Sequence, residues 1–568
     1  MTESFNLITD PWIPVLRRAG ERPESVSLRA MLNEGAHWRE IHADSPLTTA
    51  ALYRLCLAVL HAALRGPKDP RQWKKWWDDK QWDARRLSDY LDEWQSRFDL
   101  FGKHAFWQVK EGVLEKDDPA MFLRMGVDRH MGTLFDHRTA ANAPSLTLAE
   151  AAQVLVTAQT FKSGGGVSQG GFPNFTDTPW ARGVVFLAEG DTLFETLALN
   201  LVRYPLDPSV FKYQTDDPDE DIPVWERNEP FKRKHDTPRG YLDYLTWPSR
   251  RIRLMLPIET ADGWRVTRMK IAQGLALPKD LQDPAKRNRI NEKPKPKQAP
   301  FTPLKFKSGR ALWRDSATLY NWRDKQVHRP HVCDWLGELS NPLNRILGSS
   351  HRLRLMGFGM ATEERQAANI LFTRAERLPL PLSFLTDENL VGKLSGATEM
   401  ADKTGDALER ALYTLAAGLT DVKYNLSPKS DTPTEVEEKP RKSKRKKKEE
   451  DEEDQGEEKK SQADDKLVKI VNTWGLDAPF WDALEREFEQ FVNALDIARD
   501  NADGRALAIG AWQKALRHAA FETMSIAQRY AGDSPRALQA GVKARGYLAM
   551  QLGGILPQAK PIQEEKNT

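Results

Sequence analysis

The chain has 568 residues, of which 40% are hydrophobic, so it can bury a sizeable core and is long enough for more than one domain. Its 84 lysines and arginines nearly balance 81 aspartates and glutamates, and a net charge of +3 permits a nucleic-acid partner without the excess typical of histones. Only Cys56 and Cys333 are present, which excludes a disulfide framework and zinc sites built on several thiolates. We find no apolar run near the ~20 residues that span a bilayer and no secretion signal, and expect a cytoplasmic protein without a membrane partner.

The first part of the chain predicts a β-ribbon followed by a long helix. Residues 6–16 are apolar and β-prone, and residues 26–28 can return as the second strand after a turn. Ser45 is a good N-cap and Pro46 suits the first helical position, where a missing N–H costs nothing. Gly66, followed by a proline, ends this predicted helix.

Two further helices have clear start signals. Thr147 and Glu150 have the spacing of a capping box, and the apolar positions that follow predict a helix ending near Phe161. Residues 183–187 are apolar enough for a buried strand, and Thr192 opens the next helix.

A glycine-rich loop follows the helix that ends near Phe161. Glycines occupy five of the eight positions 164–171, an arrangement that costs ordering entropy without a packing gain. Such a loop is expected where the main chain must come very close to a flat partner, such as a groove edge or a phosphate chain. It lacks the Gly-Lys-Ser/Thr ending of a nucleotide-binding loop, and ordinary loop flexibility is the alternative.

Residues 286–310 are the most basic part of the folded body. Nine lysines and arginines there face a single acidic residue, Glu292, and the prolines among them predict an extended, mobile loop. With a nucleic-acid partner, which the net charge permits, this loop would contact phosphates and make binding depend steeply on salt. The candidate residues for these contacts with the nucleic-acid backbone are Lys286, Arg287, Arg289, Lys305 and Lys307.

From about residue 376 the apolar spacing becomes helical. Four amphipathic segments with mostly short joints, one of which has Phe480, Leu484 and Phe488 at helical spacing, predict a four-helix bundle. One joint, residues 427–466, carries 12 basic and 14 acidic side chains with almost no apolar ones, and we predict that it is disordered. The expected fold class is α+β, with a mixed α/β domain over 1–375 and a bundle over 376–568.

A catalytic function has little support in the sequence. Asp128, His130, Asp136 and His137 are residue types that bind metals in nucleases, but their spacing matches no metal-ligand motif. We therefore predict no metal, no cofactor and no enzymatic activity. A metal-dependent nuclease that uses these four residues remains the alternative, and a scaffold that touches only protein is a third possibility.

Several segments, in order along the chain, resemble the CasA family, the large subunit of the type I-E CRISPR surveillance complex Cascade. The resemblance covers essentially the whole chain, including the helical C-terminal third. Its segments are Asn6–Pro14, His104–Gln108, Leu134–His137, the glycines at 164–166 and 170–171, and Gln366-Ala-Ala shortly after Met356–Gly359.

This resemblance implies a non-catalytic DNA reader. Members of the family sit at the 5′ end of the guide RNA among other Cascade subunits and test duplex DNA for the short motif beside a target. They do so from the minor groove, whose edges differ little between base pairs, and then help to unpair the strands. A recruited helicase–nuclease cuts the DNA, and base pairing with the guide selects the target.

The resemblance also assigns roles to residues. The glycines would approach the groove floor and Gln366 would be a wedge under the last flanking base pair, with Ala367 beside it. Arg365 precedes the wedge where the best-known pattern has asparagine, which puts the preferred flanking motif in doubt. The assigned residues are Gly164, Gly165, Gly166, Lys270 (with Arg268 nearly as good a candidate), Arg365, Gln366 and Ala367 for the groove, and Phe135, Asp136 and His137 for the loop at the guide's 5′ handle.

Overall fold

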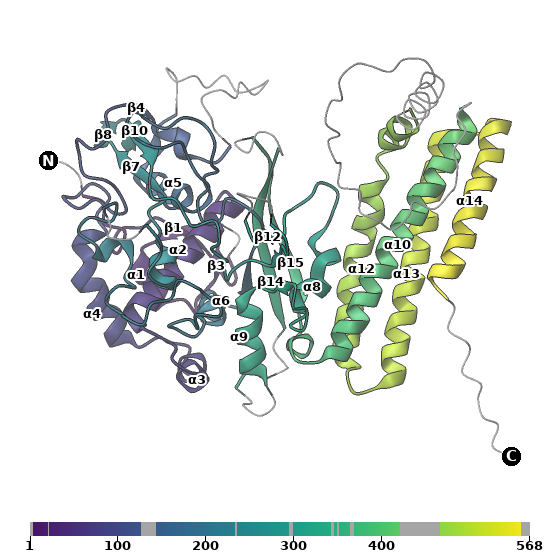
Figure 1. Cartoon of the computed structure of the whole chain (residues 1–568), viewed down its shortest axis with the longest axis horizontal. Helices are drawn as coiled ribbons and strands as arrows, with labels where there is room; N and C mark the ends of the chain where they lie inside the picture. Colours follow the sequence, from purple (N-terminus) through teal and green to yellow (C-terminus); the bar gives the residue numbers. More distant parts are fainter. Residues whose placement is uncertain are drawn as a thin grey trace. The chain divides into compact units, whose positions relative to one another are not determined.

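The computed structural model describes residues 4–20, 22–126, 144–232, 236–294, 299–341, 346–348, 352–363, 369–420 and 466–557. The chain divides into two compact units (Figure 1). The first comprises Met1–Ser308 and Asp315–Val391, and the second comprises Gly309–Arg314 and Gly392–Thr568. We predicted a domain boundary at residue 375. This residue lies inside strand β15 (Ile370–Leu380), which is paired along its length with a neighbouring strand, and the first unit continues to Val391.

The strands of the first unit form small antiparallel sheets. In the described part of the chain there are five of them, each with three strands. Their orders are β2-β1-β3, β4-β10-β7, β5-β9-β8, β12-β11-β13 and β15-β14-β6. The strands are β1 (Ile13–Arg17), β2 (Glu24–Val26), β3 (Trp38–Ile41), β4 (Asp117–Pro119), β5 (Leu146–Thr147), β6 (Val185–Glu189), β7 (Arg250–Leu254), β8 (Ile258–Thr260), β9 (Gly263–Val266), β10 (Arg268–Gln273), β11 (Asn288–Ile290), β12 (Phe301–Pro303), β13 (Val327–His328), β14 (Leu353–Thr362) and β15.

Helices surround these sheets and supply much of the core. They are α1 (Leu28–Asn33), α2 (Pro46–Leu64), α3 (Pro70–Asp79), α4 (Ala84–Trp94), α5 (Leu148–Phe161), α6 (Leu193–Asn200), α7 (Tyr241–Leu245), α8 (Ser316–Tyr320) and α9 (His331–Ser340). The mixed α+β architecture expected from the sequence is confirmed.

The predicted helix starts are confirmed at three places. The Ser45 hydroxyl accepts a hydrogen bond from the Leu47 N–H, Thr147 and Glu150 complete a capping box, and Thr192 caps α6. The predicted return strand lies two residues earlier than expected, at Glu24–Val26, because Ser27 caps α1 and Leu28 already begins this helix.

Helix α2 is the central helix of the first unit. It has 19 residues and is apolar and long enough to cross a membrane. However, 89% of its most apolar stretch is buried inside the fold, as is typical of a core helix. The expectation that no apolar segment approaches membrane-spanning length was therefore too strong.

The described part of the second unit contains four long helices, which run alongside one another (Figure 1). They are α10 (Glu388–Leu419), whose first residues belong to the first unit, α12 (Asp477–Ile497), α13 (Ala502–Ala531) and α14 (Pro535–Ile555), and residues 466–474 are also helical. The predicted helical bundle is confirmed. Nearly all of the predicted charged insertion, residues 427–466, lies outside the described residues.

A short segment from the middle of the chain completes the core of this second unit. Trp313 is buried, with its ring 4.6 Å from that of Phe488 and 5.9 Å from that of Trp512, measured between centroids. The next residue, Arg314, lies 3.5 Å above the ring of Trp481 and forms an ion pair with Asp402. The bundle therefore depends on residues far from its own helices in sequence.

Candidate nucleic-acid interface

The glycine-rich loop is held in a defined conformation, and glycine is required at its positions for two different physical reasons. A Cβ atom on Gly164 would lie 2.8–3.0 Å from the main chain of Thr176 and Asp177, so close packing requires glycine there. Gly165 and Gly166 have φ values of +100° and +80°, which L side chains rarely adopt, and face open space. The expectation that these glycines bring no packing gain is wrong for Gly164. At Gly165 and Gly166 the expectation holds, because nothing packs where a side chain would be and the main chain is uncovered.

The loop returns on itself through main-chain hydrogen bonds. The Gly165 N–H donates to the Phe175 carbonyl at 2.9 Å, and the Phe175 N–H donates to the Gly166 carbonyl at 3.4 Å. The Gly164 N–H donates to the Asp177 carboxylate at 2.7 Å. The tip of the loop is therefore presented by a short internal ladder.

A buried arginine on β7 clamps both ends of the loop. The Arg250 guanidinium donates to the carbonyls of Lys162, Ser163 and Thr176 at 3.0, 3.1 and 2.7 Å. Burial lowers the pKa of Arg250 to about 9, so it remains charged at neutral pH, and charge-assisted hydrogen bonds of this kind are stronger than neutral ones.

The loop also lies against β10. The Gln169 side chain donates to the Ile271 carbonyl at 3.0 Å, and the Ser168 hydroxyl accepts from the Gln273 N–H at 2.9 Å. The Gln273 carboxamide in turn accepts from the Thr176 N–H at 2.8 Å. The glycine loop is thereby held against the strand that carries Lys270, the other groove candidate named from the sequence.

The two cations proposed for the groove lie on β10 in different settings. The Lys270 ammonium group donates to the Leu114 carbonyl at 3.0 Å and is half-buried. Arg268 forms an ion pair with Asp117 at 2.8 Å, and this partner lowers the pKa of the Asp117 carboxyl. The hydrogen-bond partner of the Lys270 ammonium group is a neutral carbonyl, whereas Arg268 is held by a carboxylate, which makes Lys270 the better groove candidate of the two.

A polar bridge joins the glycine loop to the long β14–β15 hairpin. Asp177 accepts from the Gly164 N–H with one carboxylate oxygen and, at 3.0 Å, from the Arg182 Nε with the other. The Arg182 Nη1 donates to the Thr362 hydroxyl at 3.0 Å. Thr362 is the last residue of β14 and pairs with Ile370 of β15, so the bridge ends where the described part of the hairpin meets the segment that contains residue 366.

Several predicted site residues lie outside the described residues. These are the wedge residues Arg365, Gln366 and Ala367, the handle-loop residues Phe135, Asp136 and His137, and the remaining two members of the alternative metal site, Asp128 and His130. In the part of the chain that the structure describes, no three His, Cys, Asp or Glu side chains are grouped to hold a metal ion.

The basic segment 286–310 is only partly what the sequence predicted. Instead of one extended loop, it contains the strands β11 and β12, and Lys286 lies inside the fold. The Lys286 ammonium group donates to the Pro179 carbonyl at 2.7 Å and lies 3.5 Å from Asp283, and burial lowers its pKa. Lys286 is therefore not placed to meet a phosphate, and its inclusion among the backbone contacts was wrong.

The other cations of this segment differ in exposure. Arg287 is half-buried, and burial lowers its pKa. Arg289, Lys305 and Lys307 are exposed, and none of the three has a side-chain hydrogen bond or ion pair with another described residue. These three remain candidates for phosphate contacts.

Sequence reasoning missed the residues that organise this interface. Arg250, Asp177 and Arg182 belong to no motif and act through contacts with segments distant in sequence. The one usable signal was Arg250, a cation that shares the inward-facing side of β7 with Ile252 and Leu254, because a buried charge needs specific partners.

Comparisons with known proteins identify the family of this chain. A sequence model of the family described as CRISPR-associated protein Cse1 matches residues 6–523. The CasA/Cse1 protein of Thermus thermophilus is 30% identical over an alignment of 572 positions, which covers 97% of this chain and 98% of that protein.

Solved structures have the same fold. One structure of Thermus thermophilus CasA superposes with a TM-score of 0.73 at 27% identity, covering 97% of this chain and 100% of that one. Cse1 of Thermobifida fusca gives 0.74 at 23% identity, covering 98% and 99%. A chain of a CRISPR RNA-guided surveillance complex gives 0.68 at 18% identity, covering 96% and 99%. The family match spans most of the chain, and we conclude that this chain belongs to the CRISPR-associated Cse1 (CasA) family.

Proposed function

We propose that this chain is the non-catalytic, DNA-reading large subunit of a type I-E Cascade complex in a prokaryotic cytoplasm. In this role it joins a guide RNA and the other Cascade subunits. It recognises the protospacer-adjacent motif in duplex DNA from the minor groove, promotes strand opening and R-loop formation, and helps to recruit the helicase–nuclease. The cutting chemistry then lies on another chain.

The observation that carries the proposal is the bridge from Gly164 through Asp177 and Arg182 to Thr362. It connects the bare main chain of the glycine loop with the end of the β14–β15 hairpin from which the chain continues to Gln366. A reader that both probes a groove and pries it open needs these two parts at a fixed separation, since a misplaced wedge would meet the wrong base step.

Lys270 supports the same role from the neighbouring strand. A cation beside bare main chain suits the minor groove, where negative potential is concentrated. The exposed Arg289, Lys305 and Lys307 would add phosphate contacts, which position DNA without reading its sequence. Phe135, Asp136 and His137 are proposed for the guide's 5′ handle by family resemblance alone.

Co-purification is the direct test of the assembly. The chain should join a guide-bearing multi-subunit particle, and removing it should abolish engagement of duplex DNA. Loss of the chain without any effect on duplex binding would contradict the proposal.

Two substitutions then test the reading device inside the assembled particle. Gln366→Ala should slow strand opening on linear DNA more than it affects assembly, and Gly165→Asp should abolish flank-dependent binding, because it places a negative charge toward phosphates. The nuclease alternative predicts DNA turnover with magnesium or manganese that disappears in His137→Ala. Such turnover by the purified chain would replace the proposal.

A further inference from the structure

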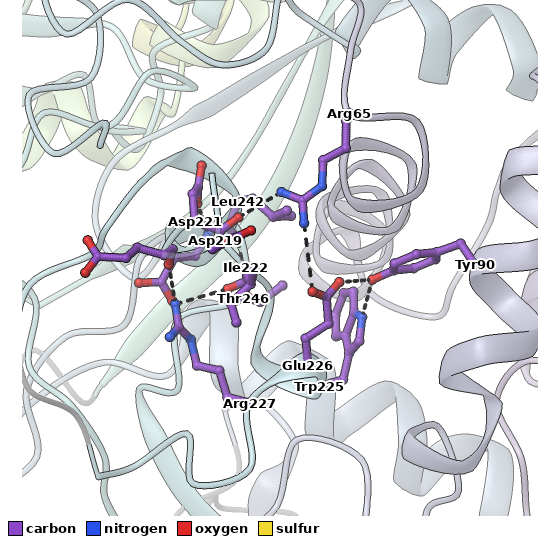
Figure 2. A network of polar contacts seen from close by, with 12 residues as sticks. Arg65, Tyr90, Asp219, Asp221, Ile222, Trp225, Glu226, Arg227, Leu242 and Thr246 are labelled. Carbon is purple, nitrogen blue, oxygen red and sulfur yellow. Dashed lines mark hydrogen bonds and ion pairs between the residues drawn. The ribbon is translucent and has the colours of Figure 1, made fainter. Parts of the chain in front are cut away.

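A cavity of about 330 Å³ lies in the first unit beside the glycine loop. Trp225 and Arg227 line one wall of the cavity, and polar contacts hold their segment in place (Figure 2). The Trp225 indole donates to the Tyr90 hydroxyl at 2.7 Å, and this hydroxyl donates to Glu226 at 2.6 Å. Figure 2 shows Arg65 approaching the same carboxylate from the end of α2. The cavity therefore has a pre-formed wall.

The cavity is strongly electropositive. Seven lysine or arginine side chains line it against a single carboxylate, Glu229. Glu229 lies 3.9 Å from Lys110 and 3.3 Å from Lys232, so one acidic group is shared by two of the cations. Partial burial, followed by the charges of Arg97, Lys103 and Lys110, lowers the pKa of His104. A positive field at this density suits an anionic ligand.

Aromatic side chains stand among these cations. The Arg251 guanidinium lies between Phe172 and Phe231, 5.1 and 5.2 Å from their ring centroids. Both rings are half-buried and pack against the core cluster of Val109, Leu114 and Ala272. Planar faces next to cations are the combination with which proteins bind unpaired bases.

Trp107 gives an independent sign of function in the same cavity. Its φ of +53° is unusual for a bulky residue. In the described chain the other non-glycine residues with positive φ, Arg65 and Lys80, are both C-caps of helices, where this conformation is common. Backbone strain of this kind at a wall residue is typical of binding sites.

The cavity adjoins the glycine loop through Phe172, which belongs to that loop. The volume is at the low end of small-ligand pockets, so it can take one nucleotide but not a base pair. A strand leaving the duplex next to the loop would reach this cavity first.

We propose that this cavity receives one unpaired nucleotide of the DNA strand that leaves the flanking duplex, with its base on the aromatic walls and its phosphate among Lys103, Lys110 and Arg253. This inference rests on the proposed function, because it needs strand opening beside the glycine loop. Capture of one nucleotide would hold the first opened step against re-pairing.

The experiment uses the assembled particle and DNA duplexes that carry 2-aminopurine at successive positions of the flank and the adjoining target. We expect a fluorescence change on binding at one position, and loss of that change in Phe172→Leu and in the double variant Lys103→Gln/Lys110→Gln. The double variant should also bind opened DNA about tenfold more weakly. Lys68→Gln/Lys75→Gln, which removes the same charge from exposed positions on and before α3, should behave like the wild type.

The outcomes separate this inference from the proposed function. If flank-dependent binding occurs but no DNA position responds, or if a 2-aminopurine in the guide RNA responds instead, the cavity is not a DNA site and the proposed function stands. If flank-dependent binding itself is absent, the proposed function fails first. Particle assembly and the melting temperature of each variant report whether it folds, and a signal that survives in folded Phe172→Leu and Lys103→Gln/Lys110→Gln particles would overturn the inference.

Discussion

The glycine loop and the basic segment 286–310 stand out equally in the sequence, yet the structure treats them in opposite ways. The loop looks flexible by composition and is fixed by a buried arginine, two glutamines and an aspartate. The basic segment looks uniformly available and is divided, with Lys286 inside the fold and Arg289 exposed. Composition therefore indicates which residue types are present, whereas burial decides which of them can meet a partner.

The largest expected effect comes from replacing Arg250, the buried arginine that holds both ends of the glycine loop. Arg250→Leu should lower the free energy of unfolding by about 3 kcal/mol or more, because several buried carbonyls lose a charged donor. Arg250→Lys, which keeps the charge but not the fork of donors, should lose less. Chemical denaturation measures both, and a leucine variant as stable as the wild type would show that the loop does not depend on this clamp.

Within the loop, two glycines with equal space around them should respond differently. Gly165→Ala forces a side chain into a positive φ at a cost of about 1–2 kcal/mol and should weaken flank-dependent binding roughly tenfold. Gly170→Ala is the matched control, because Gly170 also faces open space but has no positive φ. Equal effects on duplex affinity would mean that main-chain conformation is not what the loop contributes.

The bridge to the hairpin predicts a kinetic effect rather than a loss of folding. Arg182→Ala should slow strand opening about tenfold, equivalent to about 1.4 kcal/mol, while particle assembly and initial flank binding are retained. Arg203→Ala removes an exposed arginine that pairs with Glu338 and should leave opening unchanged. If the two variants open DNA at the same rate in a stopped-flow assay, the bridge does not position the wedge.

The smallest effect separates the two parts of the basic segment. Replacing Arg289, Lys305 and Lys307 by glutamine should reduce the slope of log K against log salt by about 0.9 for each phosphate that is no longer neutralised. Lys286→Gln should instead reduce stability and leave this slope unchanged, since Lys286 is buried. A salt slope that falls with Lys286→Gln would place this lysine at the DNA and reverse our assignment.

Local signals in the sequence predicted much of the fold. The caps at Ser45, Thr147 and Thr192 and the spacing of Phe480, Leu484 and Phe488 are encoded within a few residues, and all are confirmed. The basic segment was predicted less well, because nothing near Lys286 in sequence announces that the Pro179 carbonyl will bind it.

The candidate site was predictable only in outline. The glycines and Lys270 could be named from a family resemblance, but the residues that join them could not. Asp177 lies 13 positions from Gly164, and Arg182 lies 180 positions from Thr362, so their contacts follow from the completed tertiary structure. Trp107 is similar, because its main-chain conformation has no signature in the residue types around it.

Trp313 has a consequence for how this protein can be divided. The chain passes between the two units three times, at 308/309, 314/315 and 391/392. The short segment 309–314 between the first two of these connections places the Trp313 indole in the aromatic cluster of the bundle. A fragment that begins at residue 392 would leave Phe488 and Trp512 facing a vacancy the size of a tryptophan. Limited proteolysis at a single connection should therefore yield a nicked protein whose pieces stay together, and exchange of the bundle between homologues must carry residues 309–314 along with it.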